Sequence, residues 1–81
     1  MNREELKTQL AALRIDPIAY SLSGGLPNER LVLNQISNGK WEVYYSERGE
    51  KSSLHTFDSE SDAVQYFLNT IVHDSAVRRI N

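Results

Sequence analysis

Apolar residues near the start of the chain are spaced as on one face of an amphipathic helix. They recur at intervals of four and three, at Leu6, Leu10 and Leu13. Asn2 and Glu5 have the spacing of a capping box, which predicts where the helix begins. Pro17 disfavours helical backbone at Asp16, so the helix should end by about Ile15.

A second helix is predicted after residues 58–62, near the end of the chain. Asp58 or Ser59 can cap it, and Glu60 and Asp62 suit its first turn, because the helix dipole favours negative charge there. Its apolar stripe consists of Ala63, Val64, Phe67, Leu68 and Ile71. Each terminal helix thus has one apolar face to bury.

Asn38-Gly39 lies between two runs of alternating apolar and polar residues, 30–37 and 40–46. This arrangement predicts a hairpin with a two-residue type I′ turn. The turn sets which residues lie opposite one another: Ile36 and Trp41, Asn34 and Val43, Val32 and Tyr45. We expect this largely apolar set to form the core face of the sheet.

Two shorter segments complete the sheet. Residues 18–22 predict a short strand, residues 23–28 a loop rich in glycine and proline, and residues 51–57 an edge strand. The order predicts an α+β two-layer sandwich formed by one domain, residues 1–81. An N-terminal helix precedes an antiparallel meander of three to four strands, and a C-terminal helix follows it.

We expect both helices to cover the sheet face that carries Trp41. The other face would then expose Leu31, Leu33 and Tyr44. Two interpretations of this second face are open: the N-terminal helix covers it, or it binds a partner. If a homodimer forms, we expect it to form through Leu31, Leu33 and Tyr44.

The composition excludes several classes of chemistry. Among its 81 residues the chain has no cysteine, which rules out disulfides and thiol catalysis. The net charge of −2, with acidic and basic residues mixed, argues against a nucleic acid or an anionic membrane as partner. No apolar run has the length of a membrane span, and the first residues lack the apolar core of a signal peptide. The expected location is the cytoplasm.

The sequence contains no pattern that is typical of a catalytic or metal-binding site. The two histidines, His55 and His73, have no metal-ligand spacing, and Ser23-Gly24-Gly25 lacks the lysine of a phosphate-binding loop. Lys40, Trp41, Tyr44, Tyr45 and Arg48 suit single-stranded nucleic acid, but interleaved glutamates and the expected burial of Trp41 oppose this. We expect a protein without enzyme activity, cofactor or metal.

Glu47, Arg48, Gly49 and Glu50 form a predicted turn with charged side chains. One interpretation is that these charges only keep the protein soluble. The other is a rigid hairpin tip that offers two carboxylates and a guanidinium to another protein, where Arg48 could bind a carboxylate with two hydrogen bonds.

Three stretches together resemble a family of small bacterial immunity proteins from polymorphic-toxin and contact-dependent growth inhibition systems. They are residues 22–29, LSGGLPNE; residues 41–49, with the pattern W-x-V-Y-Y-x-E-R-G; and residues 57–60, FDSE, followed by Ala63 and YFL at 66–68. Where the family is expected to have a cysteine after that alanine, this chain has Val64.

The resemblance implies a protein that binds a cognate toxin C-terminal domain, expected to be a nuclease, and occludes its active site. It implies no enzyme activity and no cofactor. The alternative is a small regulatory or scaffolding module that binds proteins but has no toxin partner. As an interface we predict acidic groups around an aromatic anchor that cover a basic cleft. These residues are Glu42, Tyr44, Glu47, Arg48, Glu50, Asp58 and Glu60.

Overall fold

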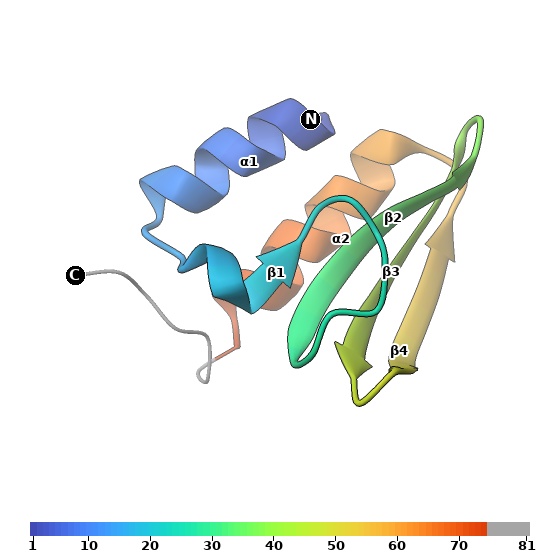
Figure 1. The fold of residues 1–81 in the computed structure, drawn as a ribbon. Helices are drawn as coiled ribbons and strands as arrows, with labels where there is room; N and C mark the ends of the chain where they lie inside the picture. The colour runs from blue at the N-terminus through green and yellow to red at the C-terminus, as the bar shows by residue number, and fades with distance from the viewer. Residues whose placement is uncertain (75–81) are drawn as a thin grey trace.

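The computed structural model describes residues 1–74 and has an α+β fold (Figure 1). Two helices lie on one side of a four-stranded sheet whose strand order is β1-β2-β3-β4. The predicted α+β class and element order are confirmed. The predicted antiparallel meander is wrong in one part: β1 runs parallel to β2, whereas the other strands pair antiparallel. The elements are α1 (Arg3–Ala12), a 3-10 helix (Pro17–Ala19), β1 (Tyr20–Ser21), β2 (Arg30–Ser37), β3 (Lys40–Glu47), β4 (Glu50–Phe57) and α2 (Glu60–Val72).

Helix α2 covers the sheet face that carries Trp41, as the sequence predicts. Ser59 caps the helix by accepting a hydrogen bond from the backbone N–H of Asp62 at 3.1 Å. The buried stripe of α2 meets Trp41 and Val43 of the central strand β3. That stripe consists of Ala63, Val64, Phe67 and Ile71. Leu68 is only partly buried at the border of this core.

Helix α1 packs against α2 (Figure 1). The predicted capping box is present: the Glu5 N–H donates to the Asn2 side chain at 2.8 Å, and the Asn2 N–H donates to the Glu5 carboxylate at 3.3 Å. Leu13 was expected on the buried stripe but is 38% exposed. The backbone turns sharply at Arg14, where φ is +59°, and brings Ile15 into the core in its place.

The first hairpin has a different register from the predicted one. Ser37 pairs with Lys40, but Gln35 rather than Ile36 lies opposite Trp41, so Ile36 is the extra residue of a β-bulge. The predicted pairs Ile36–Trp41, Asn34–Val43 and Val32–Tyr45 are therefore wrong by one residue.

The reason for this shift lies in the turn. A type I′ turn needs positive φ at both central residues, whereas here Gly39 has φ +74° and Asn38 does not have positive φ. The bulge accommodates a turn that has positive φ at Gly39 alone. The resulting shift of one residue in the pairing moves every side chain of β2 to the opposite face. Leu33 consequently faces Val43 and the core, and Val32 faces Tyr44 on the other side of the sheet.

The second face of the sheet is covered by neither helix. Residues 22–29, which we call the glycine loop, leave β1 and cross in front of β2 and β3 before β2 begins (Figure 1). The Tyr44 hydroxyl donates a hydrogen bond of 2.5 Å to the Gly25 carbonyl, and both Val32 and Tyr44 are buried. The predicted open face of Leu31, Leu33 and Tyr44 is wrong, since Leu33 and Tyr44 are buried on opposite sides of the sheet. Leu31, Leu33 and Tyr44 therefore do not form one exposed face.

Gly24 is the position where the glycine loop approaches the sheet most closely. A Cβ atom there would lie 2.4 Å from the Asn34 side-chain oxygen, whereas at Gly25 the nearest atom is Pro27 Cδ at 3.9 Å. Both glycines have positive φ, +74° and +87°, so alanine is strained at either position.

We therefore predict that Gly24→Ala destabilises the fold more than Gly25→Ala. The shared backbone strain should cost about 1 kcal/mol at either position. Displacement of Asn34 from its hydrogen bond with Glu42 should add about 1–2 kcal/mol in Gly24→Ala. Urea unfolding of both variants measures the difference, and equal free energies would contradict the close approach.

Candidate functional site

The turn between β3 and β4, residues 47–50, presents charged side chains at the end of the sheet; we call it the charged turn. Glu47 pairs with Glu50, which leaves Arg48 and Gly49 as the two central residues. Both have positive φ, +54° and +78°. This is the combination that a type I′ turn requires, and its twist matches that of the flanking strands.

The charged turn is attached to the glycine loop. The backbone N–H of Arg48 donates a hydrogen bond of 3.2 Å to the side-chain oxygen of Asn28. The side chains of Glu47, Arg48 and Glu50 remain exposed. Together with Lys51 and Ser52 they line a shallow hollow of about 240 Å³. The turn is thus fixed through its backbone, and its charged groups are left to contact another molecule.

Glu42 and Tyr44, predicted as interface residues, are buried instead. Glu42 is 7% exposed, and its carboxylate accepts hydrogen bonds from the Asn34 amide at 3.0 Å and the Lys51 ammonium at 3.1 Å. The same ammonium lies 4.5 Å from the centre of the Tyr44 ring. Burial is the main reason that the pKa of Tyr44 is raised above 10.0. Tyr44 holds the loop on the sheet, and neither buried residue is available as a surface anchor.

Asp58 and Glu60 are far from the charged turn, because the eight-residue strand β4 separates them from it. A strand of this length spans about 23 Å. Exposed Asp58 pairs with Lys40, whose hydrogen bond lowers the pKa of the carboxyl. The Glu60 carboxylate accepts a hydrogen bond of 2.8 Å from the backbone N–H of Arg3 and so joins the starts of α1 and α2. The predicted interface residues therefore do not form one patch.

Two residues that matter to the candidate site were not identified from the sequence: Asn28, which holds the turn, and Lys51, which joins Glu42 to Tyr44. In the sequence analysis Lys51 is only the first residue of the edge strand predicted at residues 51–57. Its opposition to Ser46 in the β3–β4 register places it on the face of Tyr44. That placement follows from the register between the strands, and the pattern of residues 51–57 alone does not give it.

Comparisons with models of protein families, with curated proteins and with solved structures give no match to this chain. Across residues 1–74, no helix combines the length and the apolar character needed to cross a membrane. In the same part of the chain, no group of three or more histidine or acidic side chains is placed to hold a metal ion.

Removal of one oxygen atom tests the attachment of the glycine loop. We predict that Tyr44→Phe lowers the free energy of unfolding by about 1 kcal/mol, because the buried Tyr44 side chain loses its hydrogen bond to the Gly25 carbonyl. Hydrogen exchange should also become faster across residues 22–29. Tyr45→Phe is the matched control, since the Tyr45 hydroxyl has no hydrogen-bond partner within residues 1–74. We expect the control to change the free energy by less than about 0.5 kcal/mol, and an equal loss in both variants would contradict the prediction.

Proposed function

We propose that this chain is an immunity protein that binds a cognate bacterial toxin domain, expected to be a nuclease, and neutralises it by covering its active site in the cytoplasm. One observation carries the proposal: a charged hairpin tip whose backbone is fixed while its side chains are exposed. The resemblance of residues 22–29, 41–49 and 57–68 to toxin-immunity proteins supports the same interpretation.

The proposed contact is made by Glu47, Arg48 and Glu50. A nuclease cleft is basic because it binds phosphates, so exposed carboxylates on a rigid tip complement it. Arg48 can bind a carboxylate of the partner through two parallel hydrogen bonds. The turn is already formed before binding, and this lowers the entropy lost in the complex. Glu42, Tyr44 and Glu60 support the fold and take no part in this contact, and Asp58 lies outside it.

Co-expression tests the proposal directly. The toxic C-terminal domain encoded immediately upstream of this chain is expressed with and without it, and cell survival and co-purification are measured. We expect survival and a stable complex. If no toxin domain is encoded there, or if cells die although folded protein is present, the immunity proposal is wrong and a general protein-binding module replaces it.

The role of the two carboxylates can be measured separately from survival. We predict that Glu47→Gln with Glu50→Gln slows association with the toxin domain about three- to tenfold at low ionic strength. The same double variant should flatten the salt dependence of the association rate, because opposite charges at the rim of an interface act mainly on encounter. Stopped-flow fluorescence of Trp41 or of a label on the toxin domain measures the rate.

Asp62→Lys is the control for this experiment. It changes the net charge by the same amount, but at an exposed position in the first turn of α2. We expect it to slow association less than the double variant does. An association rate of the double variant that is the same as wild type at all salt concentrations would refute the electrostatic contact.

A further inference from the structure

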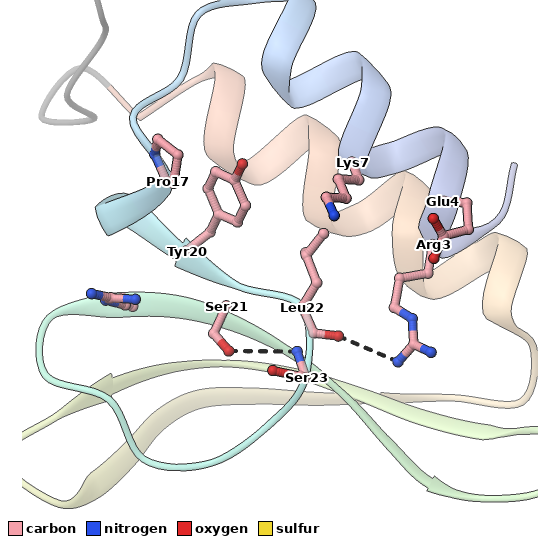
Figure 2. A pocket seen from close by; sticks show the side chains of 9 residues that line it. Arg3, Glu4, Lys7, Pro17, Tyr20, Ser21, Leu22 and Ser23 are labelled. Atoms are coloured by element: carbon pink, nitrogen blue, oxygen red, sulfur yellow. Dashed lines mark hydrogen bonds between the residues drawn. The ribbon is translucent and has the colours of Figure 1, made fainter.

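A second surface lies at the opposite edge of the sheet, between α1 and β1. It is an open hollow of about 560 Å³, and Figure 2 shows Arg3, Glu4 and Lys7 of α1 on one side of it and Tyr20 and Ser21 of β1 on the other. Arg30, the first residue of β2, also lines it. We call it the cationic hollow, because Arg3, Lys7 and Arg30 supply three positive charges against the single carboxylate of Glu4.

These cations are brought together although the chain as a whole is acidic, with a net charge of −2. Arg3 and Lys7 are four residues apart and so lie on the same face of α1, an arrangement of like charges that weakens a helix slightly. Neither Lys7 nor Arg30 has an ion pair or side-chain hydrogen bond within the described residues. Their charges are therefore available to a ligand.

Arg3 is held in place by the fold. Its guanidinium donates a hydrogen bond of 3.4 Å to the Leu22 carbonyl, drawn as a dashed line in Figure 2, and lies 5.8 Å from the centre of the Trp41 ring. The cationic hollow thus combines one fixed cation with two that can adjust. Tyr20 stacks edge-on against Phe67 of the core and gives the hollow a firm, partly apolar floor.

The spacing of the cations indicates the shape of the ligand. In the parallel pairing of β1 with β2, Tyr20 lies opposite Leu31, which places Arg30 level with Ala19. Arg3 is bonded to the carbonyl of Leu22, three residues further along the chain. Three residues of extended chain span about 10 Å. This separation of the backbone positions favours a ligand that carries several carboxylates along its length, such as those of successive residues of an extended peptide.

We propose that the cationic hollow binds an extended acidic segment of a partner protein, with Lys7 and Arg30 pairing with its carboxylates and Arg3 fixing one end. This surface is separate from the charged turn, and the inference does not depend on the immunity proposal. Exposed ion pairs are individually weak, so binding requires several carboxylates in sequence and falls as salt rises.

The test uses the full chain and a capped hexaglutamate peptide as the probe, with amide chemical shifts followed by NMR at low ionic strength. We expect shifts confined to residues around Lys7, Tyr20, Ser21 and Arg30. Lys7→Gln with Arg30→Gln should weaken binding about five- to tenfold. If the double variant does not give a folded spectrum, Lys7→Gln alone is used, because Lys7 is an exposed helix residue; it should then weaken binding at least twofold.

Arg14→Glu is the matched control, because it changes the net charge by the same amount as the double variant at an exposed arginine outside the cationic hollow. It should leave the affinity within about twofold of wild type. Capped hexaglutamine should not bind. The proposal is overturned if Arg14→Glu weakens binding as much as the double variant, or if the shifts lie elsewhere. It is equally overturned if tripolyphosphate binds in the hollow more tightly than the peptide, since the site would then suit a small anion and not a protein segment.

Discussion

The hydrogen bond from the Tyr44 hydroxyl to the Gly25 carbonyl is the contact on which the second side of the sheet depends. A sheet of this size has two faces, and the helices cover only one of them (Figure 1). The glycine loop covers part of the other, and it can do so because Gly24 brings backbone against the Asn34 side chain where no Cβ fits. Buried Val32 and Tyr44 would otherwise face water. Asn28 of the same loop also holds the charged turn through the backbone of Arg48. The loop that covers the sheet therefore positions Glu47 and Arg48 as well.

Local patterns were sufficient to predict the helices and the order of the elements. The capping box of Asn2 and Glu5 and the cap at Ser59 are interactions within a few residues, and sequence spacing records them directly. The register of β2 was not predictable in this way. Asn38-Gly39 is a common type I′ sequence, yet the turn has positive φ only at glycine and is accompanied by a bulge at Ile36. Because side chains alternate, that single residue exchanged the two faces of β2.

The second hairpin, between β3 and β4, forms a type I′ turn although arginine and not asparagine precedes its glycine. Arg48 takes positive φ, which costs an ordinary residue about 1–2 kcal/mol. The hydrogen bond from its N–H to Asn28 and the closing pair of Glu47 and Glu50 offset this cost. Asn28 is twenty residues away in the sequence, so this hydrogen bond cannot be predicted from residues 47–50 alone. The acidic residues were misjudged for a related reason: Glu42 and Glu60 satisfy backbone and side-chain donors within the fold.

Two groups of charged side chains in residues 1–74 are not used by the fold and differ in sign and in place. Glu47 and Glu50 lie at the β3–β4 turn, whereas Lys7 of α1 and Arg30 of β2 line the hollow between α1 and β1. A net charge of −2 conceals this separation, because opposite charges cancel in the sum but not in space. A partner with a basic cleft and a partner segment rich in carboxylates would therefore meet different residues of this domain.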